Sequence, residues 1–496
     1  MKYESTRNKN TKVLSHQAVI RGLADDGGLF VPEKIDIHFD LEKLCSLSYQ
    51  EAACEIIHAF LDDYSEEEIR KCVDNAYDDK FSSNEIVPLH LIENGAFMEL
   101  WHGPTCAFKD VALTILPHLL TAAYKKENRD DTVAILTATS GDTGKAALSG
   151  FADVPHTNIT VFYPEIGVSP IQKKQMNTSE GKNVEVIAVK GNFDDCQRLV
   201  KQAVHDPLVE KNLKGVTISS ANSINIGRLV PQIVYYYTAY ASLVRKGKIR
   251  CGEEINYTVP TGNFGDILAG WLAKETGLPV HKLICASNTN NVLTDFINTG
   301  IYDRRRTFHP TISPSMDILI SSNLERLLYL LSARNDSLVA ELMKELNEKG
   351  VYTVPAEIKE KIQKDFSAYW TDEDACRKTI KAAFEEDHAL IDPHTAVALH
   401  AMRQYQKETG DTRMNVVLST ASPYKFAANV VQSLTGTKPE DDFDAMDQLY
   451  QLTGEPIPYS LSTLKDKPVR FTRVIEIKDG IQTIADKMKE LGNDHD

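Results

Sequence analysis

A single lysine, Lys109, stands in a segment that is otherwise poor in charge. It ends the run HGPTCAFK and precedes Asp110 and the apolar stretch VALTILPHLLTAA. Burial disfavours the ammonium form of a lysine, so a lysine in such surroundings can lose its proton and act as a nucleophile or as a Schiff-base partner. The same residues also suit a structural lysine that Asp110 caps at the start of a helix. Local chemistry alone leaves both interpretations open.

Two loops have the composition of an anion-binding turn. Residues 137–145 (TATSGDTGK) offer hydroxyls and consecutive backbone N–H groups at a predicted helix start, which is typical of a receptor for a carboxylate or a phosphate. The glycine spacing of this loop excludes the P-loop pattern GxxxxGK[ST]. Residues 260–266 (PTGNFGD) contain two glycines three positions apart, which let the backbone wrap around an anion. A plain strand-to-helix turn is the alternative for each loop.

Two further segments combine hydroxyl and amide groups. In SSANSINIGR (219–228), such groups precede Arg228, whose planar cation could reach a bound anion, although a surface salt bridge would use an arginine equally well. In LSTASP (418–423), a predicted strand ends in hydroxyls, one of which could meet a ring nitrogen; an ordinary N-cap is the alternative. His394, in the turn IDPHTAVA (391–398), is predicted to be structural rather than catalytic.

The elements around these loops alternate between strands and helices, which favours α/β layering. Short apolar runs rich in β-branched residues predict strands that are buried on both faces of a parallel sheet. These runs span 133–139, 158–164, 184–189, 255–260, 282–287 and 414–420. Ligands of open α/β sheets gather at the carboxyl ends of the strands, where loops of this kind converge. Residues 323–385 show a helical and charged pattern.

Three regions are predicted along the chain. Residues 1–90 form a small, mostly helical cap domain, in which Ser65 is the N-cap of the helix in SEEEIRKCVDNAY. Residues 91–435 form the catalytic α/β region, with a smaller subdomain at about 130–240 inserted in the larger one. Residues 436–496 form a helical and charged tail, for which we predict surface packing.

Composition narrows the classes of function. The chain has 496 residues, 42% hydrophobic and 25% charged, which is typical of a globular protein with more than one core. A net charge of −15 argues against nucleic acid or an anionic membrane as partner. The 8 cysteines form no CxxC pair and no zinc-like cluster, so no metal site is predicted. The polar N-terminus and the lack of a long apolar run predict no secretory signal and no membrane span, and hence a cytoplasmic protein.

Taken together, the chain resembles the threonine synthases, a family of pyridoxal-phosphate enzymes of fold type II. The resemblance extends from Tyr3 to about Phe426 and is closest to the longer subgroup with an N-terminal extension. It is carried by motifs in the family's order and roughly its spacing: YESTRN, GLADDGGLFVP, HGPTCAFKD, TATSGDTGKAA, SSANSINIGR, PTGNFGD, SPSMDI, SSNLERLLY, DPHTAVA and STASPYKF. It implies two interlocked, open, twisted and mostly parallel sheets flanked by helices, with pyridoxal 5′-phosphate as the cofactor.

The resemblance also implies a role for each loop. Lys109 would be the Schiff-base lysine, and Thr420 would face the pyridine nitrogen. The cofactor phosphate would be held by Gly262, Asn263, Phe264, Gly265 and Asp266. The substrate carboxylate and the phenolic oxygen of the cofactor would be contacted by Thr139, Ser140, Gly141, Asp142 and Thr143, with Asp142 on the cofactor side. The substrate phosphate would meet Asn222, Ser223 and Arg228.

The implied reaction converts O-phospho-L-homoserine and water into L-threonine and phosphate. The protein would thus be a carbon–oxygen lyase of threonine biosynthesis that acts on a phosphate ester, as a monomer or homodimer. The alternative within the family is a phospholyase that yields 2-oxobutyrate, phosphate and ammonia. An alternative from another class, a non-catalytic binder of phosphorylated metabolites, would leave Lys109 without a purpose.

Two positions depart from the family pattern. Ser422 stands where the family commonly has a histidine, which removes a group near the cofactor. Asp142 stands where relatives outside the longer subgroup often have asparagine, which makes the field beside the phenolic oxygen more negative.

Overall fold

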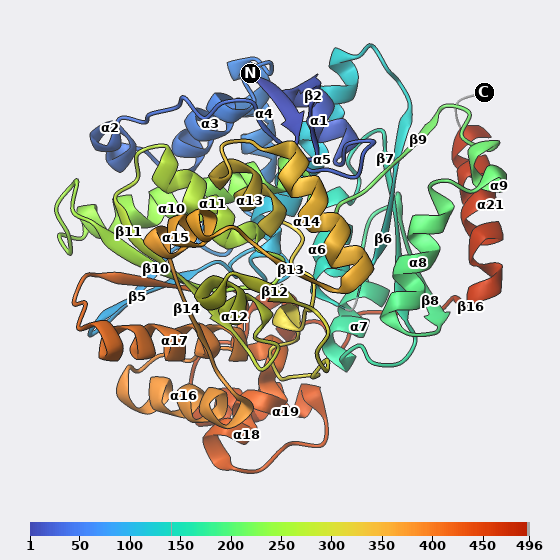
Figure 1. Cartoon of the computed structure of the whole chain (residues 1–496). Coiled ribbons are helices and arrows are strands. Elements are labelled where there is room, and N and C mark those ends of the chain that lie inside the picture. Colours follow the sequence, from blue (N-terminus) through green and yellow to red (C-terminus); the bar gives the residue numbers. More distant parts are fainter. Residues whose placement is uncertain (140, 494–496) are drawn as a thin grey trace.

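The computed structural model describes residues 1–139 and 141–493, and two parallel sheets form its centre (Figure 1). The larger sheet has the strand order β14-β11-β10-β15-β5-β4, in which β4 runs antiparallel to its neighbour and the others run parallel. The smaller sheet is parallel, in the order β16-β8-β7-β6-β9. Helices flank both sheets, so the predicted α/β architecture of two mostly parallel sheets is confirmed.

The predicted strands all occur, with ends that differ from the prediction by at most 2 residues. Both β7 and β10 are buried along their whole length, which explains their continuous apolar sequence. The strands of the larger sheet are β4 (Leu89–Ile92), β5 (Gly95–Glu99), β10 (Ile255–Pro260), β11 (Val280–Ser287), β14 (Phe366–Trp370) and β15 (Asn415–Ser419). Those of the smaller sheet are β6 (Thr132–Ala138), β7 (Thr157–Pro164), β8 (Val184–Lys190), β9 (Val216–Ser219) and β16 (Val474–Glu476).

The helical prediction over 323–385 is wrong at β14. Helix α15 (Ala356–Asp365) ends where FSAYW begins, and this segment pairs in parallel with β11. Its alternation of buried and more exposed residues is that of an edge strand, and the helical pattern before it hid the change of period. A second short strand in this region, β13 (Val351–Thr353), pairs antiparallel with β12 (Ile301–Asp303).

The N-terminal region begins with a small antiparallel sheet, β2-β1-β3, which the prediction of a mostly helical cap did not include. Its strands are β1 (Lys2–Ser5), β2 (Asn8–Leu14) and β3 (Phe30–Pro32). Two helices follow, α3 (Tyr49–Phe60) and α4 (Glu66–Ala76), and the second is the helix predicted after Ser65. Ser65 is confirmed as the N-cap of α4, because its hydroxyl accepts the Glu68 N–H while the Glu68 carboxylate accepts the Ser65 N–H.

The C-terminal segment completes the smaller sheet. Strand β16 pairs in parallel with β8, and helix α21 (Gly480–Asn493) buries Ile484 and Met488 beside α8 (Phe193–Ala203). Arg470 lies just before β16, and its guanidinium donates to the carbonyls of Ser179 and Gly181, which lie just before β8. The tail therefore contributes a strand and core residues in addition to the predicted surface helices.

The remaining helices fill the space around the two sheets (Figure 1). They are α1 (Ser15–Arg21), α2 (Leu41–Ser46), α5 (Lys109–Lys126), α6 (Asp142–Phe151), α7 (Pro170–Asn177), α9 (Pro207–Glu210), α10 (Ile226–Arg245), α11 (Gly265–Glu275), α12 (Val292–Thr299), α13 (Leu324–Leu331), α14 (Asp336–Lys349), α16 (Glu373–Glu386), α17 (Pro393–Thr409), α18 (Ala427–Thr435), α19 (Asp442–Thr453) and α20 (Tyr459–Ser462). Among the described residues there are also three single turns of 3-10 helix: η1 (Pro314–Met316), η2 (Pro423–Phe426) and η3 (Ile477–Asp479).

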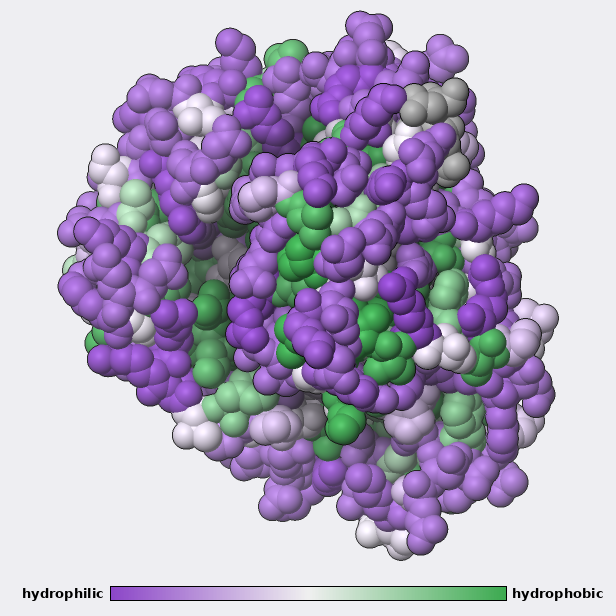
Figure 2. Space-filling view, turned by 90° about the vertical axis from the view of Figure 1, so that its right-hand side faces the viewer, coloured by the Kyte–Doolittle hydropathy of each residue, from purple (hydrophilic) through white to green (hydrophobic). Residues whose placement is uncertain are grey.

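The face shown in Figure 2 is mostly hydrophilic, with apolar side chains in small separate groups. In the part of the chain that the structure describes, no helix is both long and apolar enough to cross a membrane.

Helix α5, which begins at Lys109, packs closely against α6 of the smaller subdomain. The closest approach is at Gly150, where an added Cβ would lie 2.0 Å from the carbonyl oxygen of Leu113. We expect Gly150→Ala to lower the free energy of unfolding by about 1–3 kcal/mol, because the two backbones must separate. Urea unfolding checks this, with Ser149→Ala in the same helix as the control. An equal midpoint for both variants would contradict the close packing.

Candidate active site

Lys109 lies at the first position of α5, partly shielded from solvent. Its Nζ donates to the Ser315 hydroxyl over 3.4 Å and lies 5.5 Å from the centre of the Phe108 ring. Burial lowers the pKa of the Lys109 amine to about 8, and the nearby Asp142 carboxylate partly opposes that shift. The Asp110 carboxylate instead accepts the backbone N–H and the hydroxyl of Thr105, so it shapes the turn before the lysine.

The loop between β10 and α11 presents backbone donors. The carbonyl of Gly262 accepts the Ser321 hydroxyl, and the carbonyl of Asn263 accepts the Asn323 side chain. These bonds fix the peptide planes. Within the described residues, the N–H groups of Asn263, Phe264 and Gly265 donate to no protein acceptor. Phe264 also takes a left-handed conformation (φ 62°), which a non-glycine residue adopts at a cost, so the turn is held for its shape.

Asp266 belongs to this loop, but its carboxylate faces α10. It accepts hydrogen bonds from the hydroxyls of Tyr235 and Tyr236 over 2.6 and 2.9 Å. Burial raises the pKa of Asp266 to about 6, against the effect of the two hydroxyls. The contribution of Asp266 to an anion site would thus come from its backbone N–H at the start of α11.

Three contacts bring the predicted loops together. A Cβ added to Gly262 would lie 2.7 Å from the carbonyl oxygen of Ser315, so the residue that contacts Lys109 also packs against the 262–265 loop. The Phe108 N–H donates to the Thr420 carbonyl over 2.8 Å, which places Thr420 beside the backbone of Lys109. The buried Thr420 side chain makes no hydrogen bond through its hydroxyl among the described residues.

A buried ion pair lies next to Lys109. Lys425 Nζ is 2.5 Å from Asp142 Oδ1, and the two side chains are 0% and 5% exposed. The Lys425 ammonium also donates to the Thr105 carbonyl, and the Gln172 amide donates to Asp142. Burial alone would raise the pKa of Asp142. The charges of Lys425 and Lys109 and the Gln172 hydrogen bond outweigh it and hold that pKa well below the ordinary value.

The turn at the start of α6 is closed by Thr139. Its hydroxyl accepts the N–H groups of Gly141 and Gly144 over 3.0 and 2.9 Å, so it binds both the N-cap residue Gly141 and the first turn of the helix. Gly144 leaves space for this residue, since an added Cβ would lie 2.3 Å from Thr139 Cγ2. Thr143 lies in the first turn of the helix, and Ser140 lies outside the described residues.

Arg228 points a buried guanidinium into the same region. Its Nη1 donates to the Ala221 carbonyl over 2.8 Å, while its Nε has no partner in the described structure. Burial lowers the pKa of Arg228 to about 10, so the guanidinium remains charged at neutral pH. Asn323 joins this segment to the 262–265 loop, because its amide donates to the carbonyls of both Ser223 and Asn263. Asn222 is exposed beside them.

Four residues that the structure places here had no function predicted from the sequence: Gln172, Ser315, Asn323 and Lys425. Three of them lie within the quoted motifs SPSMDI, SSNLERLLY and STASPYKF, so the motifs held the signal. Gln172 lies in no such motif, and only the fold brings it to Asp142.

These residues fit pyridoxal phosphate. The unpaired N–H groups at 263–265 suit its phosphate, the Lys109 amine with its lowered pKa suits its aldehyde, and the free Thr420 hydroxyl suits its ring nitrogen.

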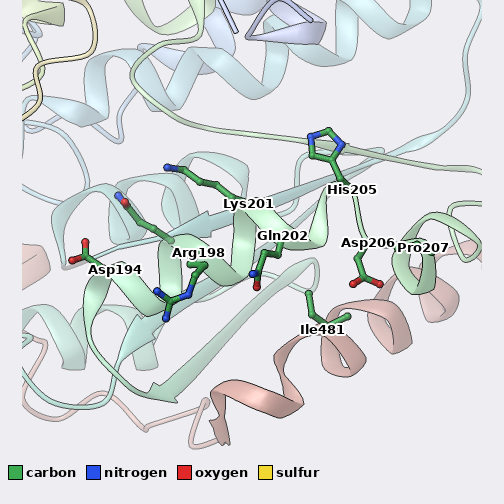
Figure 3. A pocket seen from close by; sticks show the side chains of 9 residues that line it. Asp194, Arg198, Lys201, Gln202, His205, Asp206, Pro207 and Ile481 are labelled. Atoms are coloured by element: carbon green, nitrogen blue, oxygen red, sulfur yellow. The ribbon is translucent and has the colours of Figure 1, made fainter. Parts of the chain in front are cut away.

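A surface hollow of about 810 Å³ lies elsewhere, between α8 and α21 (Figure 3). Its labelled side chains, among them Lys201, His205 and Asp206, point in different directions rather than towards a common centre. Most are exposed, and Arg198 is paired with Asp195. The hollow therefore lacks the convergent polar groups that mark a binding site.

Three known protein families together match almost the whole chain. Residues 2–77 match the threonine synthase N terminus, residues 96–420 match the pyridoxal-phosphate dependent enzymes, and residues 395–484 match the threonine synthase C-terminal family.

Individual relatives are similar over most of the chain. Threonine synthase from Pseudomonas aeruginosa is 38% identical over 88% of this chain and 92% of its own length. Threonine synthase-like 1 from Homo sapiens is 39% identical over 87% of this chain. The matched part covers only 59% of the length of that protein. A crystal structure of PLP-bound threonine synthase from Brucella melitensis is 34% identical, with a TM-score of 0.88 and 99% of both chains covered.

The contribution of the Lys425–Asp142 pair to stability can be measured by mutation. We expect Lys425→Met to lower the free energy of unfolding by about 3–5 kcal/mol, because it leaves a buried carboxylate unpaired. The folded-state pKa of Asp142 lies below its ordinary value, so the pair stabilises the fold at neutral pH and loses this effect only as the pH falls towards that lowered pKa. Urea unfolding at neutral pH measures the loss. The double variant Lys425→Met/Asp142→Asn should regain much of it, and an additive double variant would contradict the pairing.

Proposed function

The chain belongs to the threonine synthase family of pyridoxal-phosphate-dependent enzymes, and we propose that it converts O-phospho-L-homoserine and water into L-threonine and phosphate. The observation that carries the proposal is the juxtaposition of the Lys109 amine, an unpaired backbone cradle and the buried Arg228 guanidinium. The first two suit an aldehyde cofactor with a phosphate. The third suits a second phosphate, on the substrate.

Lys109 carries the proton transfers in this proposal. Its Nζ would hold the aldehyde cofactor, and the same amine would be free for proton transfer once the substrate occupies the site. The freed Nζ then removes the Cα proton and afterwards a Cβ proton. With a pKa of about 8, on the order of a tenth of the free amine is unprotonated at pH 7, far more than for an ordinary lysine. When bound, pyridoxal phosphate supplies the electron sink that stabilises the substrate carbanion.

The other residues bind and orient. Arg228, with Asn222 and Ser223, holds the substrate phosphate and stabilises the charge that develops as this phosphate leaves. The turn at 139–143 receives the substrate carboxylate at the start of α6. Asp142, fixed by Lys425 and Gln172, stays ionised beside the phenolic oxygen of the cofactor.

The phospholyase reaction is the second candidate, because it would use the same residues. Relatives at 38% and 39% identity are named threonine synthase and threonine synthase-like 1, so similarity alone does not select the product. Both reactions release phosphate from the same position. In the threonine synthase reaction, water adds at Cβ before the product leaves. In the phospholyase reaction, the product leaves as a 2-oxo acid, and ammonia is released.

Replacement of the lysine tests the anchor. We expect Lys109→Ala to abolish both the visible imine absorbance and phosphate release, because no other amine replaces Nζ. Absorbance spectra and a phosphate assay measure the two effects. Lys126→Ala, at the other end of the same helix, serves as the control and should keep both. Turnover in Lys109→Ala would overturn the assignment of the lysine.

Product analysis tests the reaction. With O-phospho-L-homoserine in ¹⁸O-labelled water, we expect threonine and phosphate in equal amounts, with one labelled oxygen in the threonine hydroxyl. Mass spectrometry detects the label, and coupled assays measure 2-oxobutyrate and ammonia. Equal amounts of phosphate, ammonia and 2-oxobutyrate, with no threonine, would favour the phospholyase instead.

A further inference from the structure

The Ser315 hydroxyl contacts the reactive amine, yet the proposed function gives it no role. Ser315 lies in the single turn η1, 206 positions along the chain from Lys109, and its Oγ accepts from Lys109 Nζ over 3.4 Å. In the part of the chain that the structure describes, Nζ makes no other hydrogen bond.

One side of the turn is fixed by the Asp317 carboxylate. Its Oδ1 accepts hydrogen bonds from the amides of Asn288 and Asn290 and from the Thr311 hydroxyl, over 2.8, 3.0 and 2.7 Å. Its Oδ2 accepts the Thr311 N–H over 2.9 Å. Four donors on one carboxylate leave the backbone that follows Ser315 little freedom.

The other side is fixed by a buried histidine. The Ser315 N–H donates to His394 Nε2 over 3.1 Å, and His394 Nδ1 lies 2.5 Å from Asp392 Oδ2. Because Nε2 accepts a proton donor, the imidazole carries its own proton on Nδ1 and donates it to Asp392. Asp392 is fully buried and also accepts the N–H groups of His394 and Thr395. This geometry agrees with the structural role predicted for His394 and shows that the group it holds is the Ser315 N–H.

Charged groups face Lys109 from four elements. Asp142 on α6 and Asp110 on α5 favour its ammonium form, whereas Lys425 on η2 and Arg228 on α10 disfavour it. These groups act through space. Ser315 differs from them because it meets the amine directly, and because both flanks of its turn are held, only its hydroxyl is free to rotate.

We propose that Ser315 is a further catalytic residue, whose oxygen stabilises Lys109 while Nζ carries the abstracted proton, and that His394 is a positioning residue that acts through the Ser315 N–H. The inference rests on the proposed role of Lys109 as anchor and base. It adds a hydrogen-bond acceptor to that role and changes neither the cofactor nor the substrate.

The test follows the titration of Lys109 without turnover. The full-length chain is freed of cofactor, and the growth of visible absorbance after addition of pyridoxal phosphate is recorded between pH 6 and pH 10. A lost acceptor destabilises the ammonium form, so Ser315→Ala should move the midpoint of the pH–rate curve down by about one pH unit, a tenfold change in the equilibrium. Ser315→Thr, which keeps a hydroxyl, should return the midpoint to the wild-type value.

Ser313→Ala is the matched control. It removes another buried hydroxyl from the same segment, one that accepts from Asn288 and does not contact Lys109. Its midpoint should equal that of the wild type. An unchanged midpoint in Ser315→Ala would overturn the proposal. If instead the Lys109→Ala chain acquires the absorbance, the anchor itself is misassigned, so the two failures are distinguishable.

Turnover and NMR give independent readouts. In the loaded enzyme, Ser315→Ala should lower kcat by about tenfold and change KM less than twofold, because the contact forms while Nζ holds a proton. The ¹⁵N signals of His394, assigned by their loss in His394→Gln, should show a neutral ring with its proton on Nδ1. A doubly protonated ring at pH 7, or a proton on Nε2, would refute the positioning role.

Discussion

The site depends on the placement of three cations, Lys109, Lys425 and Arg228, in one shielded region of a chain whose net charge is −15. Each cation loses solvation there, and only some of that loss is offset by Asp142 and Asp110. The remaining positive potential is what a phosphate needs on arrival. A cofactor and a substrate that each carry a phosphate would supply the missing negative charge, so binding and charge balance favour each other.

Backbone groups extend this field without adding charge. The carbonyls of the 262–263 turn are occupied from behind by Ser321 and Asn323, so the N–H groups are left for a ligand. Asn323 is in turn held by the buried Arg326, whose guanidinium also donates to the carbonyl of Phe30 in the N-terminal sheet. The N-terminal sheet is therefore connected to the 262–265 loop through Arg326 and Asn323, which gives a physical reason for its attachment to the larger sheet.

The sequence predicted the parts of this arrangement that depend on local pattern. Buried parallel strands have continuous apolar runs, and the loops after them carry small polar residues, so both could be found from one sequence. Strand β14 was missed because a charged helix precedes it without a break, and β16 because its partner β8 lies about 290 residues away. The Lys425–Asp142 pair was missed for the same reason: no local pattern relates two charges that only the fold brings together.

Ser422, which departs from the family pattern, lies between two segments of the site. Ser422 is fully buried, its N–H donates to the Cys106 carbonyl, and its hydroxyl accepts the Tyr424 N–H at the start of the turn that carries Lys425. The Ser422 backbone therefore connects the HGPTCAFK segment to the turn that carries the buried Lys425 ammonium. A histidine would add a group that titrates near neutral pH. Serine adds no such group, so the charge of this region is set by Lys109, whose amine contacts the Ser315 hydroxyl, and by the charged groups around it.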